Sequence, residues 1–516
     1  MKQKIIALFV FALLFCAVSV AQVPNPVVWL RADSAETDTP VWRDISGNGH
    51  DAVLPADSLV VTFSRMNFNK SVELSETEFF SIPLSGTESR MSDVIIVYET
   101  YDTLADNGLW QLALDSVRRV GQTTQRILND NGQIRFDSLN RLHPVVNYLS
   151  QSWREEAGDV RLLSAGKADS LRLNGRISEL IFFNTNISDT SVIRWMSCLA
   201  IRYGVTLSET DYFDSHGNRI WSREDAPSFS ASISGVGRDD QTGLYQRQTF
   251  FADKHIIYGI GCPAPNNEDN PSLLGEGDFI LMGMDSNGLF QFSEIYLDDL
   301  LPCEVFGQSF VQTSGHVDTC STFLLLDPSS ETDTVPPVLL IDRSGEGNYN
   351  RQSTEVVGAT SVDSVGRFLY DSIRWDTDGN GRDRFCFTAH LPENFLNDGE
   401  LTLFEEQSSD QQTLSQGNIQ NRDIGGKKLS KNTENSHARY SVTPNPNHGK
   451  FLVEIEFPEI QNVTVSIFAA DGKKLQMMSG EGQSSYRFEG DIQHAGHYLV
   501  EIATLNERKT LKMVVN

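Results

Sequence analysis

Apolar and polar positions alternate in short runs along most of the chain after residue 22, which is the pattern of half-buried β-strands. Polar turn residues separate the runs, and this spacing is typical of an antiparallel sandwich. Examples between residues 23 and 207 are VVWLRA, DVIIVYET, LWQLAL and RISELIFFN. The segment SDTSVIRWMSCLAIRYG departs from this pattern, because its apolar residues recur with a helical period.

The helix predicted from that segment begins after Ser188 or Asp189, either of which can cap it, and ends at Gly204. We expect one face of it to pack on the sandwich rather than to bind a ligand, because apolar faces of this kind normally bury against a core. The side chains of this face are Val192, Trp195, Met196, Leu199 and Tyr203.

Both ends of this first region resemble a known family. VVWLRADSA, followed by VWRDISGNGHDA, resembles the opening of concanavalin-like, laminin-G-like jelly rolls of secreted Bacteroidetes proteins. GRISELIFFNTNISDTSVIRWMSCLAIRYGVTL resembles the closing strand and helix of the same domains. The resemblance implies an all-β, concanavalin-like jelly-roll sandwich over residues 22–207. Loops at one end of such a fold can hold a glycan or a protein ligand.

Residues 208–404 are predicted to form a second β-rich domain. The run SISGVGRDDQTGLYQRQTF resembles a module of unknown function that follows such jelly rolls in similar surface proteins, and it implies no chemistry. We expect Gly235 and Gly237 to loosen the end of a strand, and Arg238, Asp239 and Asp240 to form a charged turn.

Two segments are not expected to belong to a folded domain. Residues 1–21 combine basic residues, a short apolar run and small residues before a cleavage point, so they are predicted to be a signal peptide. No segment after them reaches the ~18 apolar residues of a membrane-spanning helix. Residues 405–438 are rich in Gln, Asn and Ser without an aromatic residue, which predicts a flexible linker.

Residues 439–516 are predicted to form a small β-sandwich, in which Phe451, Val453, Ile455 and Phe457 share one face. TPNPNHGKF, AADGKKL, HAGHYLVEI and the final RKTLKMVVN resemble, in order and spacing, the C-terminal sorting domain of the type IX secretion system. This resemblance implies export to the cell surface or beyond, with the translocon and its sortase as partners. The sorting residues that it implies are Pro444, Asn445, Pro446, Gly449, Asp471, Gly472, Gly496, Tyr498 and Lys512.

The formal net charge of −27 narrows the range of partners. An acidic surface of this size repels nucleic acid and anionic membranes, so neither is expected as a partner. It suits divalent cations, and it also keeps an exported protein soluble.

Two loops share the pattern D-x-[SD]-G-N-G, in which oxygen ligands alternate and Gly stands sixth, as in calcium-binding loops. Neither loop is an EF-hand, because Pro55 and Phe387 stand where the twelfth-position Glu would be. The alternative is a polar turn. The candidate Ca²⁺ ligands are Asp44, Ser46 and Asn48 in one loop, and Asp376, Asp378, Asn380 and Asp383 in the other.

The sequence carries none of the motifs HExxH, GxSxG or a P-loop. We therefore expect a non-catalytic binding or adhesion protein whose ligand is a glycan or a surface protein. One alternative is an extracellular polysaccharide hydrolase, which needs paired carboxylates. Another is a structural surface or matrix protein.

Cysteines and short acidic triplets suggest modifications. Cys198 is predicted to be a buried free thiol, whereas Cys262, Cys303, Cys320 and Cys386 allow two disulfides in three connectivities. Triplets of Asp, Ser or Thr, and an apolar residue resemble an O-glycosylation acceptor of exported Bacteroidetes proteins, and chance is the alternative. They begin at Asp33, Asp57, Asp102, Asp115, Asp137, Asp169, Asp333, Asp363 and Asp371.

Overall fold

The computed structural model divides the chain into two compact units, residues 1–408 and residues 409–516, and each is described by itself. The predicted signal peptide and linker lie outside the described residues. The structure describes residues 23–36, 41–54, 62–73, 80–84, 93–101, 105–113, 119–129, 132–135, 143–150, 160–162, 164–165, 171–207, 209–298, 300–328, 336–363, 365–392, 395, 439–445, 447–469, 474–492, 494–504 and 508–515.

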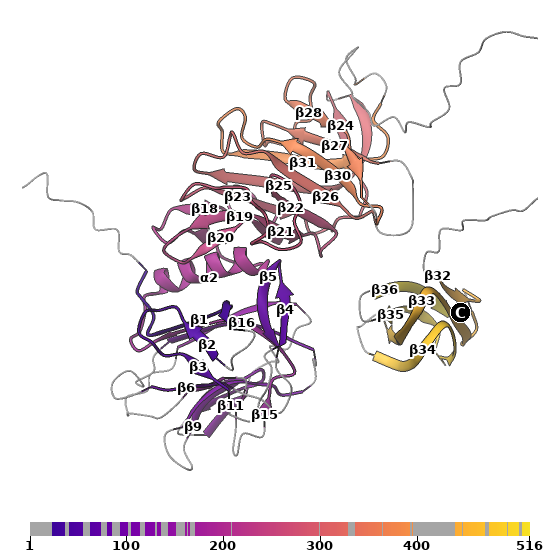
Figure 1. The fold of residues 1–516 in the computed structure, drawn as a ribbon. Coiled ribbons are helices and arrows are strands. Elements are labelled where there is room, and N and C mark those ends of the chain that lie inside the picture. Colours follow the sequence, from indigo (N-terminus) through magenta and orange to yellow (C-terminus); the bar gives the residue numbers. More distant parts are fainter. Residues whose placement is uncertain are drawn as a thin grey trace, which may run out of the picture. The chain divides into compact units, whose positions relative to one another are not determined.

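Strands account for 54% of the chain and helix for 5%, which confirms the all-β prediction. The first part of the larger unit is coloured indigo to purple in Figure 1. Fourteen of its strands form one antiparallel sheet, and β14 and β15 form a separate pair. The strands are β1 (Val28–Ala35), β2 (Val41–Asp44), β3 (Ala52–Val53), β4 (Thr62–Met66), β5 (Asn69–Glu73), β6 (Phe80–Ile82), β7 (Asp93–Thr100), β8 (Gly108–Ala113), β9 (Arg119–Thr123), β10 (Arg126–Asn129), β11 (Gly132–Arg135), β12 (Val145–Ser150), β13 (Val160–Leu162), β14 (Ser164–Ala165), β15 (Leu171–Arg172) and β16 (Gly175–Phe183).

The strands at the centre of this sheet are buried on both faces. Along β16, Leu180 and Phe182 belong to the main core, which the strands of this sheet form among themselves. Ile181 and Phe183 belong to a second core, which the sheet forms with the helix at residues 189–203. Because alternate side chains of a strand point to opposite faces, both sets must be apolar. This explains why residues 94–98 of β7 and residues 180–183 of β16 are continuous apolar runs rather than alternating ones.

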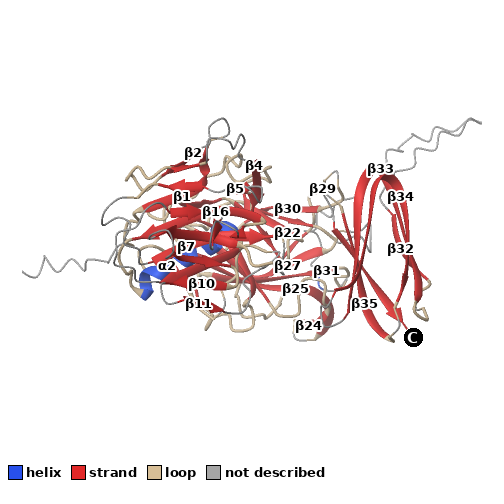
Figure 2. Cartoon of the chain, turned by 90° about the horizontal axis from the view of Figure 1, so that it is seen from below, coloured by secondary structure: helices blue, strands red, loops and turns tan. Residues whose placement is uncertain are grey.

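The helix α2 (Asp189–Tyr203) begins and ends as predicted, since Ser188 accepts a hydrogen bond from the amide of Ser191 and Gly204 is left-handed. Its predicted face lies in the core that also contains residues of β7 and β16, which confirms that prediction. Figure 2 shows the helix beside these strands. Its other face, which includes Cys198 and Ile201, packs in a different core with Phe279. One helix therefore belongs to two domains. Within the described residues, no helix is long and apolar enough to cross a membrane.

The second part of the larger unit contains an eight-stranded and a five-stranded sheet with a shared core. Val236 and Phe385 enter this core from the first sheet, and Tyr258 and Tyr370 from the second. Its strands are β17 (Tyr212–Phe213), β18 (Arg219–Trp221), β19 (Ala231–Asp239), β20 (Leu244–Gln246), β21 (Gln248–Phe251), β22 (Ile256–Ile260), β23 (Phe279–Met284), β24 (Ser293–Leu297), β25 (Leu301–Ser314), β26 (Thr322–Leu326), β27 (Val338–Asp342), β28 (Thr354–Val357), β29 (Ser361–Val362), β30 (Phe368–Ile373) and β31 (Arg382–Thr388).

The predicted roles of the Gly-Val-Gly-Arg-Asp-Asp run are wrong in part. Gly235 and Gly237 lie inside β19, where an added Cβ would come within 2.3 Å of a backbone oxygen of β23 and 2.2 Å of the Phe279 ring, respectively. They allow close packing rather than loosen a strand end. Asp239 is 1% exposed and accepts hydrogen bonds from the amides of Ser215 and Thr242. It organises the surrounding loops instead of forming a charged turn.

The tip of the β4–β5 hairpin is anchored in the second domain (Figure 1). The side-chain oxygen of Asn67 accepts hydrogen bonds from the Thr249 hydroxyl at 3.0 Å and the Phe250 amide at 2.8 Å. Its amide nitrogen donates to the carbonyl of Arg202 in α2 at 3.0 Å. The Phe68 ring stacks on Phe250 with centroids 4.3 Å apart. The hairpin thus joins the two domains through a fully engaged asparagine.

A buried ion pair lies beside this junction. Glu179 of β16 is 0% exposed, and its carboxylate accepts hydrogen bonds from Trp29 at 2.5 Å, Arg202 at 2.9 Å and Tyr203 at 2.7 Å. Arg202 also donates to the carbonyl of Thr242 in the second domain at 3.3 Å. Burial and the Glu179 charge hold the pKa of the Tyr203 hydroxyl well above its usual value.

The smaller unit is a five-stranded antiparallel module in which β33 pairs with β32, β34 and β35, and β35 pairs with β36. The long strands β33 and β34 pair with each other along most of their length, with shifts of register between Glu456 and Val463. The four side chains predicted to share a face are all buried, which confirms the alternation. The strands are β32 (Arg439–Thr443), β33 (Lys450–Ala469), β34 (Lys474–Asp491), β35 (Gly496–Ala503) and β36 (Arg508–Val515).

Candidate functional site

The loop that follows β32 in the C-terminal module is tied to the last strand. Asn445 donates from its side-chain amide to the carbonyl of Lys512 at 2.7 Å, and its side-chain oxygen accepts from the amide of Val514 at 2.9 Å. The amide of Asn447 donates to the carbonyl of Val514 at 2.9 Å. These bonds occupy backbone groups on the edge of β36 that would otherwise be free to pair with another chain.

The next turn requires glycine. Asn447 is 2% exposed, and its side-chain oxygen accepts a hydrogen bond from the amide of Gly449 at 2.8 Å. Gly449 has φ of 102°, and an added Cβ would lie 2.8 Å from the carbonyl oxygen of Ile492. Both the backbone angle and the lack of space exclude a larger residue without strain. The TPNPNHGKF motif therefore joins the start of the module to its end.

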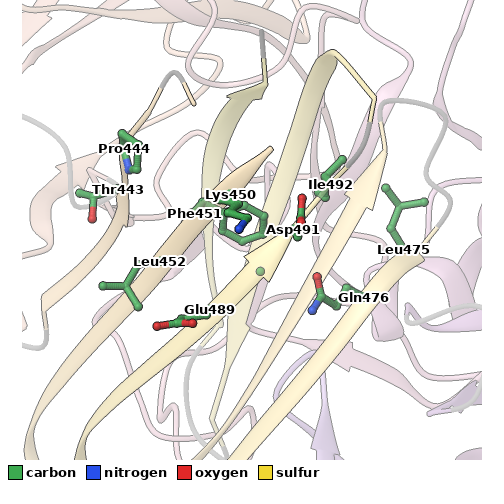
Figure 3. Close-up of a pocket in the computed structure, with 11 residues that line it drawn as sticks. Thr443, Pro444, Lys450, Phe451, Leu452, Leu475, Gln476, Glu489, Asp491 and Ile492 are labelled. Carbon is green, nitrogen blue, oxygen red and sulfur yellow. The ribbon is translucent and has the colours of Figure 1, made fainter. Parts of the chain in front are cut away.

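A cavity of about 750 Å³ opens beside this motif (Figure 3). Thr443 and Pro444 lie along one side of it, and β33, β34 and Ile492, which follows β34, supply the remainder. Its volume falls within the range of ~300–1,000 Å³ that is usual for binding sites. Three further lining residues are charged: Lys450, Glu489 and Asp491. The other lining residues are Phe451, Leu452, Leu475, Gln476, Gly490 and Ile492.

The remaining predicted sorting residues are spread along the last strands. Gly496 begins β35 opposite Val515, and the Tyr498 hydroxyl donates to the carbonyl of His494 at 2.7 Å. Lys512 is exposed on β36, where its carbonyl is the acceptor for Asn445. The structure brings Asn445 and Lys512 together at one edge. Pro446, Asp471 and Gly472 lie outside the described residues.

The first candidate calcium loop uses its carboxylate to hold its own backbone. Asp44 accepts hydrogen bonds from the amides of Trp29, Ser46 and His50, each at 2.9 Å, and from the Ser46 hydroxyl at 2.8 Å. The side-chain amide of Asn48 donates to the carbonyl of Val27 at 2.9 Å. Donors surround both carboxylate oxygens, which is the geometry of a polar turn.

The second candidate loop is held in a similar way. Asp376 accepts from the amide of Gly381 at 2.7 Å and from the hydroxyl of Thr313 at 3.1 Å. Asp378 accepts from the side-chain amide of Asn380 at 2.7 Å. Asp383 is fully buried and accepts from the amide of Asp376 at 2.7 Å. Burial raises the pKa of the Asp383 carboxyl to about 6, although the nearby Arg343 guanidinium opposes that shift.

The structure contains a third loop of this type that the sequence pattern missed. Asp342 is fully buried and accepts hydrogen bonds from the amides of Ser344, Gly347 and Asn348. The pattern required Asn at the fifth position, where this loop has Glu346. Because β27 pairs with β31, the loop lies beside the Asp376 loop, and Asn380 donates to a carbonyl of it at 3.1 Å.

These geometries favour the polar-turn alternative over calcium binding. The part of the chain that the structure describes contains no group of three or more His, Cys, Asp or Glu residues that could hold a metal. The Asp44 loop belongs to the first sheet, whereas the Asp376 loop adjoins the eight-stranded sheet of the second domain. Calcium binding by either loop stays a prediction.

All five described cysteines are free thiols, so no disulfide forms among Cys262, Cys303, Cys320 and Cys386. Cys198 is buried and unpaired, as predicted. Cys303 and Cys386 belong to one apolar cluster, and burial raises the pKa of both thiols, that of Cys386 to about 12. Burial therefore keeps these thiols protonated and unreactive.

The comparison that decides the role of the C-terminal module concerns residues 441–516. These residues match the secretion system C-terminal sorting domain. The chain carries a sorting module. It is exported through the type IX secretion system to the cell surface or the extracellular space, and the module interacts with that secretion machinery.

A second family model matches part of the larger unit. Residues 192–379 match a domain of unknown function, and the match begins inside α2. This start agrees with the packing of the helix against the second domain. No curated protein matches the sequence.

The likeness to solved structures is weak. One match is the crystal structure of dimeric latent PorU from Porphyromonas gingivalis, with 9% sequence identity and a TM-score of 0.14. The match covers 86% of this chain and 32% of PorU. It thus spans about a third of PorU. For the BSP domain of a biofilm-associated protein, the identity is 12%, the TM-score 0.14, and the coverage 89% and 84%. TM-scores this low carry no argument about fold or function.

Proposed function

We propose that residues 22–404 act outside the cell as a non-catalytic binding or adhesion protein. The observation that carries the extracellular location is the match of residues 441–516 to a secretion system C-terminal sorting domain. We further propose that residues 22–207 form a laminin-G-like jelly roll whose loops hold a glycan or a surface protein. Sequence resemblance at both ends of the region and the antiparallel sheet between them support this assignment.

The buried carboxylates of the larger unit support a non-catalytic role. Glu179 is saturated by an ion pair and two further hydrogen bonds, and Asp239 and Asp342 hold loop amides. Catalytic carboxylates must instead direct an oxygen towards a substrate in a cleft. Each of these acids has a structural partner for its charge or its lone pairs, which is the state expected of groups that stabilise the fold.

The experiment uses the mature protein recovered from the surface or medium of cells that export it. The protein is applied to a glycan array and to immobilised surface proteins, with Ca²⁺ and with a chelator. We expect binding to at least one class of ligand. A chelator that abolishes binding would support calcium in the loops, whereas an unchanged signal would support polar turns. No binding under either condition would overturn the proposal.

The same preparation separates the alternatives. Release of reducing sugar from a polysaccharide would favour the hydrolase and require two carboxylates about 5 to 10 Å apart in a cleft. A gene deletion that weakens cell adhesion, while the purified protein neither binds nor hydrolyses any ligand, would favour a structural surface or matrix protein.

A further inference from the structure

A second, smaller cavity lies at the junction of the two domains in the larger unit. Its volume is about 160 Å³, and it is lined by β1, the β4–β5 hairpin and α2 on one side and by the segment from Gly243 to Glu268 on the other. Six charged residues line it: Arg31, Asp33, Lys70, Arg202, Arg247 and Glu268. Four cations thus face two carboxylates, in a chain whose formal net charge is −27. We call this cavity the junction cavity.

Two of the cations already have full partners. Arg202 is paired with Glu179, and Arg31 donates to both carboxylate oxygens of Asp33 at 2.8 Å. The other two are less engaged. Lys70 donates to the carbonyl of Ala35 at 3.0 Å, and its ammonium lies 3.7 Å from the centre of the Phe63 ring.

Arg247 is the least satisfied of the four. Its Nη1 donates to the carbonyl of Asn267 at 3.1 Å, but its Nε is buried without an acceptor among the described residues. The guanidinium lies 3.9 Å from the centre of the Tyr245 ring, which fixes its plane. A buried donor without an acceptor is costly, and a planar guanidinium is suited to carboxylate, sulfate or phosphate oxygens.

A bare anion does not satisfy the whole cavity, because Glu268, and Asp33 beside its partner Arg31, also present hydrogen-bond acceptors to it. These two carboxylates are acceptors, and hydroxyl groups are the donors that match them. A ligand that carries one oxyanion and several hydroxyls fits both kinds of lining residue. The volume lies below the ~300–1,000 Å³ of larger ligand sites, so it suits a single sugar unit.

We propose that the junction cavity binds an acidic monosaccharide unit, such as a uronate or a sulfated sugar at the end of a glycan. Lys70 and Arg247 hold the oxyanion, and Asp33 and Glu268 accept hydrogen bonds from the hydroxyls. This inference rests on the proposed binding function and names the ligand class. Because both domains line the cavity, the ligand binds only when the domains are docked.

The test is calorimetric titration of the full mature protein with glucuronate, a sulfated monosaccharide, glucose and inorganic sulfate. Arg247→Gln removes the cation. Arg238→Gln is the matched control, because Arg238 lies 5.0 Å from the centre of the same Tyr245 ring but is paired with Asp240 and does not line the cavity. Thermal unfolding of both variants checks that each remains folded.

We expect one of the acidic sugars to bind, and glucose to bind at least ~10-fold more weakly because it offers no charge for Lys70 and Arg247. Arg247→Gln should weaken the acidic sugar by ~10-fold or more, whereas Arg238→Gln should change it by less than ~2-fold. Added salt should weaken binding.

The inference would be overturned if neither acidic sugar bound measurably, or if an acidic sugar bound Arg247→Gln as tightly as the wild type. Equal affinity for inorganic sulfate would overturn the sugar and leave a simple anion site. The glycan array is independent of this test. Binding of a neutral glycan there, with no response to acidic sugars in the titration, would leave the proposed function intact and reject only the junction cavity.

Discussion

Two junctions in this protein use the same device, an asparagine whose side chain bonds to the backbone of a distant segment. In the C-terminal module, Asn445 holds the edge of the last strand. In the larger unit, Asn67 holds the hairpin tip against the second domain and α2. The first junction closes a single domain, whereas the second joins two. The comparison teaches that the larger unit depends on contacts between domains that each domain alone would lack.

The largest expected effect comes from the ion pair beside the second junction. Arg202→Met leaves Glu179 buried without its partner, so we expect the free energy of unfolding of the larger unit to fall by ~4 kcal/mol. Chemical denaturation of the full protein measures it. Adding Glu179→Gln should restore part of the loss. Arg219→Met, which breaks an exposed pair, should cost less than ~1 kcal/mol. Equal losses in the two single variants would contradict the account.

The hairpin tip itself is the next test. Asn67→Ala removes the acceptor of Thr249 and Phe250 and the donor to Arg202, so stability should fall by ~3 kcal/mol. Asn287→Ala, in an exposed loop of the same unit, is the control and should have little effect. Hydrogen exchange at residues 246–250 should rise in Asn67→Ala alone. Unchanged exchange there would show that the asparagine does not join the domains.

What could be predicted from the sequence follows the same division. The shared face of Phe451 and Val453 and the helical face around Trp195 depend on local periodicity, which the sequence displays directly. The role of Asn67 could not be predicted, because its partners lie more than 130 residues away. The burial of Asp239 could not be predicted for a related reason, since the Ser215 amide that it binds lies in a distant loop.

The candidate sites divide in the same way. The sorting motif could be found because its spacing is local and resembles a known domain. The pattern at Asp44 and Asp376 showed which residues form tight loops, but the hydrogen bonds of each carboxylate became visible only in three dimensions. The junction cavity could not be predicted from the sequence, because Lys70 and Arg247 come from different domains.

The C-terminal junction is tested by its glycine. Gly449→Ala places a Cβ near the carbonyl of Ile492 and strains the backbone, so the module should lose ~2 kcal/mol of stability. Gly496→Ala is the matched control, because an added Cβ there meets only ordinary contacts at 3.6 Å. Thermal unfolding of the full protein measures both. A loss in Gly496→Ala as large as that in Gly449→Ala would contradict the structural role of the motif.

The smallest expected effect concerns Asp383. Its folded-state pKa of about 6 exceeds the ordinary value, so its stabilising protonated form is lost as the pH rises through 6. Between about pH 5 and pH 7 the loss of this proton should lower the free energy of unfolding by about 1 kcal/mol. Asp383→Asn should remove that pH dependence, whereas Asp318→Asn, on an exposed side chain that does not contribute to the shift, should retain it. Denaturant titrations at the two pH values measure the free energy of unfolding. The same change with pH in the wild type and in Asp383→Asn would contradict the raised pKa of Asp383.

The central claim is that residues 439–516 are an export signal that functions independently of the larger unit. The most direct measurement fuses these residues to a neutral periplasmic reporter and determines the fraction of reporter outside the cell. We predict that the fusion is exported, and that the natural protein without residues 439–516 stays in the periplasm. A retained fusion, or a truncated protein that still reaches the surface, would contradict the claim.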